Sequence, residues 1–210
     1  VICSASNKGI NEWTRSSTND WEAYFMWNAI DPSYVITPEG EHWLVYGSWH
    51  SGFTAVQLNA ETGKPLNELG KPWSINGDHS SYGDLIARRG YGRWQASEAP
   101  EIIYNSKTGY YYLFMAYDEL SVAYNTRVAR SKNIKGPYVD MVGKNITENG
   151  GGDAYPVVTH PYKFNNSYGW VGISHCAIFN DGQDNWFYAS QGRLPANVNG
   201  INASNDVMMG

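Results

Sequence analysis

The sequence predicts an all-β protein, and more narrowly a β-propeller, in which antiparallel sheets surround a central channel. Three observations favour this fold. Apolar and aromatic runs of strand length alternate with turns rich in Gly, Asn and Asp. This pattern occurs three times along the chain, and each copy opens with an ionisable residue. Helical periodicity with capping residues is not evident in the 210 residues.

The first copy covers residues 31–49 and opens with Asp31. The Pro-Glu-Gly sequence at residues 38–40 is a turn signal between two runs rich in β-branched and aromatic residues, which is typical of a hairpin. A third run follows, so we expect a β-meander. The expected strands are 33–37, 42–48 and 54–58.

The second and third copies repeat this arrangement. The second copy opens with Glu98 and turns at residues 105–109, and the third opens with His175 and turns at residues 180–182. The expected strands are 101–104, 110–117 and 126–130 in the second copy, and 177–179 and 186–190 in the third. We therefore expect each copy to belong to a sheet of about four strands.

The opening residues lie 67 and 77 positions apart, from 31 to 98 and from 98 to 175, intervals that fit propeller blades with long loops. In a propeller the innermost strand of each blade lines the channel, so Asp31, Glu98 and His175 would converge near its axis. A β-sandwich whose strands share a pattern is the alternative, and the repeat alone leaves it open. The ionisable residue at the same place in each copy favours the propeller.

Composition and charge exclude several classes of function. The formal net charge is −5 without a Lys/Arg cluster, so neither nucleic acid nor a membrane is an expected partner. No apolar run approaches the roughly 18 residues of a membrane span, and no signal peptide is visible at the start. The 9 Trp and 16 Tyr suit stacking on sugar rings, although both residue types also fill β-sheet cores. Cys3 and Cys176 fit no metal or disulfide motif, and we expect both to be buried.

Asp31 and Glu98 are candidate catalytic residues. Cleavage of a glycosidic bond needs one carboxyl group to protonate the leaving oxygen and another to activate water or attack directly. An ionised Asp31 close to Glu98 would disfavour a second negative charge and keep the acid protonated. Taken singly, each residue is better explained as a surface carboxylate or a turn cap. Only their shared placement favours chemistry.

His175 has three interpretations: a metal ligand, a proton-transfer group, or a hydrogen-bonded core histidine, and the residues alone favour the core histidine. The sequence contains no EF-hand loop, HExxH or Walker motif. Any metal ion would therefore be held mainly through water rather than by a cage of protein ligands.

Several short segments stand in a fixed order along the chain. They are 28–32 (NAIDP), 46–49 (YGSW) with 51–52 (SG), 98–100 (EAP), 128–131 (VARS) with 134–138 (IKGPY), and 174–177 (SHCA). In this order and spacing they resemble glycoside hydrolase family 43, particularly its endo-1,5-α-L-arabinanases. The resemblance spans almost the whole chain and implies a five-bladed propeller that cleaves arabinan or arabino-oligosaccharides internally.

The resemblance also implies roles for individual residues. Glu98 would be the general acid, Asp31 the pKa modulator, and His175 the ligand of a water-rich calcium ion, with inversion at the anomeric carbon. Candidate sugar contacts are Asn28, Ser48 and Trp49. Arg127 either reaches the site from a neighbouring strand or is a solvated strand residue. Glu101 should face away from Glu98 in an alternating strand, and it ranks below Glu98 as the acid.

The chain departs from the family pattern at its two ends. Residues 1–210 are expected to form part of a single catalytic propeller domain, roughly three blades of five and parts of the flanking ones, without the first blade and the C-terminal end. The general base would then lie outside this chain, because the remaining candidates open no repeat. These candidates are Asp20, Asp78 and Asp84. Since an open propeller leaves unpaired strand edges, we expect a second polypeptide piece to complete it.

Other functions stay open at this point. The enzyme alternative is an exo-acting α-L-arabinofuranosidase or β-xylosidase of the same family, since loops at the blade ends decide whether the cleft is open. A carbohydrate-binding propeller with a dead site is the alternative from another class, and a purely structural propeller would not explain two channel carboxylates. An extracellular or periplasmic location follows from the substrate, because polymeric arabinan cannot enter cells.

Overall fold

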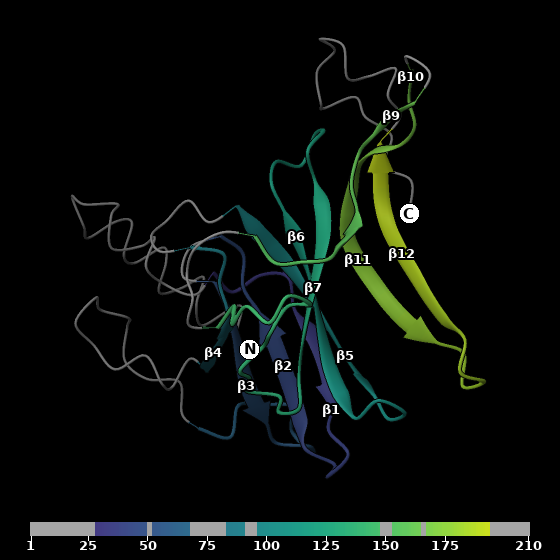
Figure 1. The fold of residues 1–210 in the computed structure, drawn as a ribbon. Coiled ribbons are helices and arrows are strands. Elements are labelled where there is room, and N and C mark those ends of the chain that lie inside the picture. The colour runs from purple at the N-terminus through teal and green to yellow at the C-terminus, as the bar shows by residue number, and fades with distance from the viewer. Residues whose placement is uncertain are drawn as a thin grey trace, which may run out of the picture.

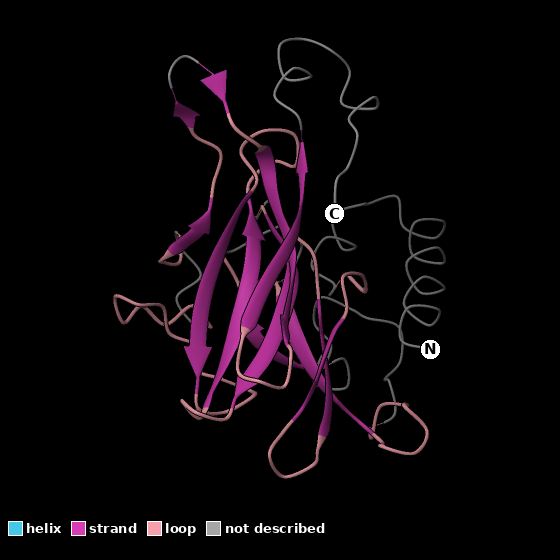
Figure 2. Cartoon of the chain, turned by 90° about the vertical axis from the view of Figure 1, so that its right-hand side faces the viewer, coloured by secondary structure: helices cyan, strands magenta, loops and turns pink. Residues whose placement is uncertain are grey.

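A computed structural model of the protein describes residues 28–49, 52–67, 83–90, 96–147, 153–164 and 167–193. The regular secondary structure in these ranges consists of β-strands (Figure 2), so the predicted all-β class is confirmed for them. Within the same ranges, no helix has the length and apolarity that crossing a membrane requires.

The first sheet is a four-stranded antiparallel meander in which strand order follows the sequence. Its strands are β1 (Ser33–Ile36), β2 (His42–Tyr46), β3 (Phe53–Leu58) and β4 (Asp84–Ala87). Side chains alternate along β1, where Val35 is buried while Tyr34 and Ile36 are exposed, because successive residues of a strand point to opposite faces. The predicted hairpin and third strand of the first copy are therefore confirmed.

The second sheet repeats this topology. Its strands are β5 (Ser97–Asn105), β6 (Tyr110–Tyr117), β7 (Asn125–Ser131) and β8 (Val157–Thr159), again paired in sequence order. Strand β5 begins earlier than the predicted 101–104, so Glu98 lies inside the strand rather than before it. Two sheets built to one plan confirm the repeat that the sequence predicted.

The third copy forms a two-stranded sheet in the described residues, β11 (Val171–Asn180) with β12 (Trp186–Arg193), preceded by the short hairpin of β9 (Lys163–Phe164) and β10 (Ser167–Tyr168). Phe179 and Phe187 stack across the sheet with ring centroids 5.1 Å apart, yet they are 52% and 45% exposed.

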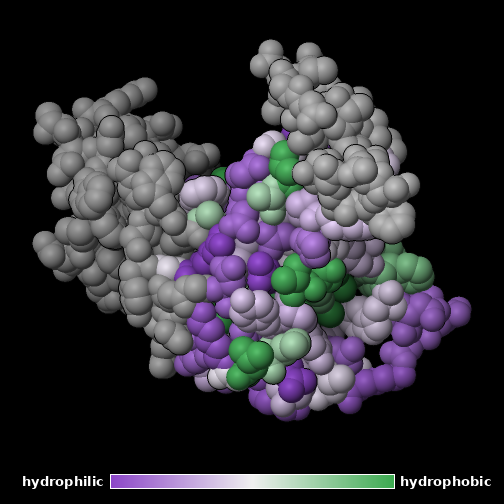
Figure 3. Space-filling model, turned by 45° about the horizontal axis from the view of Figure 1, so that its top comes forward, coloured by the Kyte–Doolittle hydropathy of each residue, from purple (hydrophilic) through white to green (hydrophobic). Residues whose placement is uncertain are grey.

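On the face seen in Figure 3, apolar residues occur in small separate areas among polar ones.

The sheets lie side by side through their first strands. Both β1 and β11 contact β5, which therefore lies between them (Figure 1). The main core packs between the first and second sheets. Its fully buried side chains include Val45, Phe53, Ile86, Leu113 and Met115. Burial of each large apolar side chain stabilises the fold by roughly 1.5–3 kcal/mol.

A backbone irregularity recurs in or just before the first strand of each copy. Asp31, Ala99 and His175 have positive φ angles of 56°, 50° and 53°, values that are uncommon for residues other than glycine. Register shifts accompany them in β5 and β11, where pairing slips between Glu98 and Glu101 and between Ser174 and Cys176. Such bulges re-aim side chains next to functional sites. The recurrence of ionisable residues thus coincides with a recurrence of strained backbone.

Candidate active site

The heads of the three copies meet at one cavity of about 190 Å³. It is lined by Asp31, Pro32, Ala99, Pro100, Glu101, His175 and Cys176. The structure therefore brings Asp31 and His175 together, 144 positions apart in sequence from 31 to 175, with Glu98 next to the lining residue Ala99. This is the convergence that the spacing of the repeats predicted.

Asp31 is joined to the second sheet through its carboxylate. Its Oδ2 accepts a hydrogen bond from the Ala99 backbone N–H at 3.1 Å. Burial raises the pKa of Asp31 above its ordinary value of 3.8; the charge of His175 and the Ala99 N–H oppose this effect, and the charge of Glu98 adds to it. The carboxylate is therefore held beside a second acidic group in a partly desolvated place.

Glu98 is held by three side-chain donors. Its Oε2 accepts hydrogen bonds from Ser48 Oγ at 3.2 Å and Trp49 Nε1 at 3.1 Å, and its Oε1 accepts one from the Tyr124 hydroxyl at 2.7 Å. Tyr124 is completely buried, and burial followed by the Glu98 contact raises its pKa, so its hydroxyl stays protonated. Hydroxyl groups accept as well as donate, whereas an indole N–H only donates. Two of the three partners can therefore bond to Glu98 in either protonation state.

Ser48 and Trp49 come from the loop after β2, which is tied to β5. The Trp49 backbone N–H donates to the Ser97 carbonyl at 2.7 Å, next to Glu98. Gly47 has φ 139°, and a Cβ there would lie 2.3 Å from the Gly52 carbonyl oxygen, so only glycine permits this close approach. Ser48 is buried and Trp49 half-buried. Both predicted site residues therefore lie at the site, where they bond to Glu98.

Tyr124 was missed by sequence reasoning, although one signal was available. It directly precedes β7, whose first residue pairs with Tyr117 at the end of the sheet where Glu98 lies. An aromatic hydroxyl at this position of the repeat can reach the strand that carries the acid. Ala99, Ala116 and Tyr124 form a small buried cluster that fixes the ring.

Asn28 belongs to a segment that is hydrogen-bonded to the loop after β2. Its carbonyl accepts a hydrogen bond from Ile30 N–H at 2.9 Å, and the Ile30 carbonyl in turn accepts one from Gly47 N–H at 3.1 Å. The neighbouring Ala29 packs with Tyr46 in a small apolar cluster. Asn28 is half-buried and lies three residues before Asp31.

Arg127 is placed differently from the other predicted sugar contacts. Only 9% of it is exposed, so the interpretation as a solvated strand residue is wrong. Its guanidinium donates to Asn125 Oδ1 at 2.6 Å and to the Ala154 carbonyl at 2.9 Å, and it lies 3.6 Å from Asp153. Asp153 also pairs with Arg89 at 2.8 Å. The described contacts of Arg127 thus join β7 to the segment before β8 rather than to Glu98.

Glu101 connects the first strands of three sheets. Its Oε2 accepts a hydrogen bond from Ser33 Oγ at 2.7 Å on β1, and its Oε1 accepts one from Ile178 N–H at 3.0 Å on β11. The same Ser33 hydroxyl accepts a hydrogen bond from Ile102 N–H at 3.0 Å. Both carboxylate oxygens are therefore engaged in contacts between sheets.

The remaining acidic and thiol candidates have structural surroundings or lie outside the described residues. Asp84 is 3.0 Å from Lys135 Nζ in an exposed ion pair. Asp20, Asp78 and Cys3 fall outside the described residues. Cys176 is a buried free thiol whose pKa is raised to about 12, chiefly by burial, so it stays protonated as a small apolar residue, as predicted.

A metal ion would find few protein ligands here. Among the described residues, no three His, Cys, Asp or Glu side chains form a group suited to hold one. His175 is exposed at the rim of the cavity that Asp31 also lines, and the cavity has room for several water molecules. Since Ca²⁺ prefers oxygen ligands, this donor set fits only an ion that is coordinated mostly by water.

Comparison with known proteins reveals extensive similarity. A family model described as "Glycosyl hydrolases family 43" matches residues 1–205. The extracellular endo-α-(1→5)-L-arabinanase of Thermotoga petrophila is 40% identical over 122 residues, which are 57% of this chain and 23% of that protein. The extracellular endo-α-(1→5)-L-arabinanase 2 of Bacillus subtilis is 35% identical over 144 residues, 65% of this chain and 28% of that protein.

The fold agrees with this relationship. The crystal structure of the endo-1,5-α-L-arabinanase from Thermotoga petrophila superposes with a TM-score of 0.68 and 28% identity, covering 83% of this chain and 39% of that one. The chain spans about a quarter of the length of the two curated relatives. Because the family model matches almost all of the sequence, the chain belongs to glycosyl hydrolase family 43.

Proposed function

We propose that this chain forms the acid side of the active site of an endo-acting arabinanase, which cleaves α-1,5-linked L-arabinan with inversion. The observation that carries the proposal is the Glu98 carboxyl group, bound by three side-chain donors next to the half-buried Asp31. The curated relatives named as endo-arabinanases support the substrate class.

Glu98 acts as the general acid in this proposal. It protonates the glycosidic oxygen as the bond to the anomeric carbon breaks, and its carboxylate is then stabilised by the indole N–H of Trp49 and the hydroxyls of Ser48 and Tyr124. The two hydroxyls can accept a hydrogen bond from the O–H of Glu98 when Glu98 is protonated, and they can donate to its carboxylate when Glu98 is ionised. The site is therefore suited to both halves of a catalytic cycle.

Asp31 acts through Glu98 as the pKa modulator. The two carboxyl groups repel each other when both are ionised, and this repulsion adds to the effect of burial in raising the pKa of Asp31. The Ala99 N–H and the charge of His175 favour the ionised form of Asp31, against the effect of burial, and we propose that Asp31 acts on Glu98 in this form. Inversion additionally needs a base that activates water, and we propose that this base lies outside the described residues.

Asn28, Ser48 and Trp49 are the proposed sugar contacts. Trp49 is half-buried, and an indole ring beside the acid can stack on the apolar face of a sugar ring. Arg127 is a weaker candidate for a sugar contact, because its guanidinium is engaged with Asn125, Ala154 and Asp153.

The wider assembly follows from the same proposal. The described sheets would be blades of a five-bladed propeller, completed by a further piece of polypeptide. His175 would hold a calcium ion that is otherwise coordinated by water; the ion would supply positive charge near the acidic groups of the channel. We propose an extracellular location, in keeping with the names of the relatives.

The test is product analysis on debranched linear arabinan. An inverting endo-arabinanase releases oligosaccharides of several lengths from the start, and the first products carry the inverted anomer in NMR spectra. Release of a single short product would instead assign an exo-acting enzyme. Binding of arabino-oligosaccharides without any hydrolysis would contradict the enzymatic proposal and favour a carbohydrate-binding propeller.

A further inference from the structure

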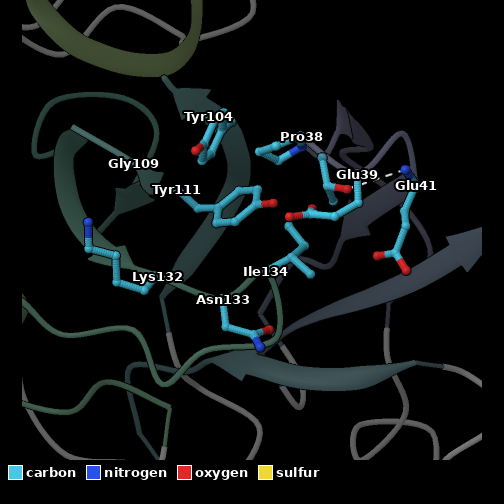
Figure 4. A pocket seen from close by; sticks show the side chains of 10 residues that line it. Pro38, Glu39, Glu41, Tyr104, Gly109, Tyr111, Lys132, Asn133 and Ile134 are labelled. Carbon is cyan, nitrogen blue, oxygen red and sulfur yellow. Dashed lines mark hydrogen bonds between the residues drawn. The ribbon is translucent and has the colours of Figure 1, made fainter. Parts of the chain in front are cut away.

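A second and larger cavity, of about 340 Å³, lies at the other end of the first two sheets. It is bounded by the β1–β2 turn, the β5–β6 turn and the residues that follow β7 (Figure 4). Tyr104, in its wall, lies six positions after Glu98 on β5, and at about 3.3 Å per residue this places it roughly 20 Å from the acid. The cavity is therefore separate from the proposed active site.

The floor of this cavity is buried and partly aromatic. Thr37, Tyr111 and Ile134 are 5%, 4% and 6% exposed. The ring of Tyr104 lies beside that of Tyr111, with centroids 4.9 Å apart. Gly109 keeps one side open, because a Cβ there would lie 3.3 Å from Lys132 Nζ and 3.9 Å from the Tyr104 hydroxyl. The cavity thus combines aromatic surface with space for a ligand.

The rim carries two carboxylates, Glu39 and Glu41, and one ammonium group, Lys132. Glu39 points toward the Tyr111 hydroxyl, whereas the Glu41 carboxylate points away (Figure 4) and accepts a hydrogen bond from Trp43 Nε1 at 3.0 Å. Lys132, on the opposite wall, donates to the Thr108 carbonyl at 2.9 Å. Burial first, and then the charge of Glu39, raise the pKa of Tyr111 to about 12, so its hydroxyl remains a donor.

These features select a class of ligand. The wall with Glu39 and Glu41 is negative and the wall with Lys132 is positive, so a charged ligand of either sign would meet a like charge at one wall, which favours an uncharged molecule. The polar groups include acceptors (Glu39), donors (Lys132) and groups that do both (Tyr111), which matches hydroxyl groups that also donate and accept. A volume above 300 Å³ is in the range of small-ligand sites, and the half-buried ring of Tyr104 can stack on the C–H face of a sugar.

We infer that this cavity is a second carbohydrate-binding site, which takes a neutral pentose oligosaccharide such as a segment of the arabinan chain. The choice of arabinan rests on the proposed function; the presence of a sugar site does not. A polymer bound at two separated sites dissociates more slowly than one bound at the active site alone, whereas a short oligosaccharide gains nothing from the second site. The site would therefore increase retention on polymeric substrate.

Binding can be measured by NMR titration and by affinity electrophoresis in linear arabinan, in a Glu98→Gln background that removes hydrolysis. We expect Tyr104→Ala and Glu39→Ala each to weaken arabinohexaose binding at this cavity roughly fivefold or more. Glu39 is exposed, so its replacement does not depend on refolding of the core. Tyr112→Ala is the matched control, because Tyr112 pairs with Ile103 on β5 and projects from the other face of the sheet than Tyr104 and Tyr111.

The outcomes separate the two proposals. Unchanged arabinohexaose and xylohexaose binding in both folded variants would overturn the second site, even if arabinan hydrolysis were demonstrated. Loss of xylohexaose binding at the cavity, with no arabinohexaose binding there, would uphold the sugar site and contradict arabinan as its ligand. Equal loss in Tyr112→Ala would show that the effect comes from the sheet and would also overturn the site.

Discussion

Glu98 and Glu101 lie three residues apart on one strand, yet their surroundings differ in kind. Within the described part of the chain, the Glu98 carboxyl group is bound by three side chains, two hydroxyls and an indole, on loops at the end of the sheets. Glu101 is bound by the Ser33 hydroxyl and the Ile178 backbone N–H, both on the first strands of neighbouring sheets. In its proposed role Glu98 exchanges a proton, which needs hydroxyl partners that can both donate and accept. Glu101 joins strands, which needs partners that keep donating, and the Ser33 hydroxyl does so because it also accepts from Ile102 N–H. The bulge between the two glutamates explains how one strand carries both.

The sharpest way to test this difference is to remove the charge from each glutamate in turn. Glu98→Gln should lower arabinan hydrolysis by about 10²- to 10⁴-fold, the range for loss of a general acid, with a small change in thermal stability. Glu101→Gln should lower the thermal stability and change arabinan hydrolysis little, because the carboxylate oxygens of Glu101 bind donors on neighbouring strands. Rates of reducing-sugar release and melting temperatures of both variants decide the matter. A comparable loss of activity in Glu101→Gln, with unchanged stability, would break the comparison.

Truncation of Glu101 should produce the largest loss of stability. Glu101→Ala leaves the Ser33 hydroxyl and the Ile178 N–H without their carboxylate partner, and hydrogen bonds to charged groups contribute about 1.5–3 kcal/mol each. We expect the free energy of unfolding to fall by about 2–4 kcal/mol, allowing for partial replacement by water. Chemical denaturation measures it, and a change below that of an ordinary surface substitution would mean that the three strands do not depend on Glu101.

Tyr124→Phe tests whether the adaptable partners of Glu98 matter. Removal of the hydroxyl deletes the 2.7 Å hydrogen bond to Glu98 Oε1, and we expect a roughly tenfold lower kcat. We also expect a shift of the basic limb of the pH–rate profile, which reports the general acid.

A suitable control for this change is Tyr138→Phe. Tyr138 is also completely buried and donates to the Ile134 carbonyl at 3.0 Å, far from Glu98 in sequence. It should lose stability without a change in the pH–rate profile. If both variants keep the original profile, Tyr124 is part of the core only.

The smallest expected effect concerns Asp31 and pH. Because the folded protein raises the pKa of Asp31 above 3.8, the folded state binds more protons than the unfolded state in the window just above that value. The contribution of Asp31 to stability is thus fully present below about pH 3.8 and is lost as pH rises through the folded pKa. Asp31→Asn should then melt at a higher temperature than the original protein near pH 7, and the difference should vanish in acid. A variant that is less stable at pH 7 would contradict the direction of this shift.

Much of the fold could be predicted from local pattern. The strands of the first two sheets follow from apolar runs and turn residues, and Asp31, Glu98 and His175 stand out because they head similar segments. Tyr124 did not stand out, since one tyrosine among 16 has the same appearance in a core as at a site. The sequence pattern also placed Glu101 only by alternation, which the bulge at Ala99 interrupts.

Contacts between sheets explain the rest of the difference. The partners of Glu101 lie 68 and 77 positions away, so no local pattern identifies them. The same holds for Arg127, whose burial depends on Ala154 and Asp153 in a segment beyond β7. A charged residue on a strand near the site suggests substrate binding, and only the three-dimensional structure shows that its donors are already engaged.

The central claim is that Glu98 supplies the proton to the departing sugar, and dependence on the leaving group tests it most directly. Glu98→Gln should be compared with the original protein on linear arabinan and on an arabino-oligosaccharide that carries a dinitrophenyl leaving group, which departs without protonation. We expect a loss of about 10²- to 10⁴-fold on arabinan and nearly full activity on the dinitrophenyl substrate. An equal loss on both substrates would contradict the role of Glu98 as the general acid.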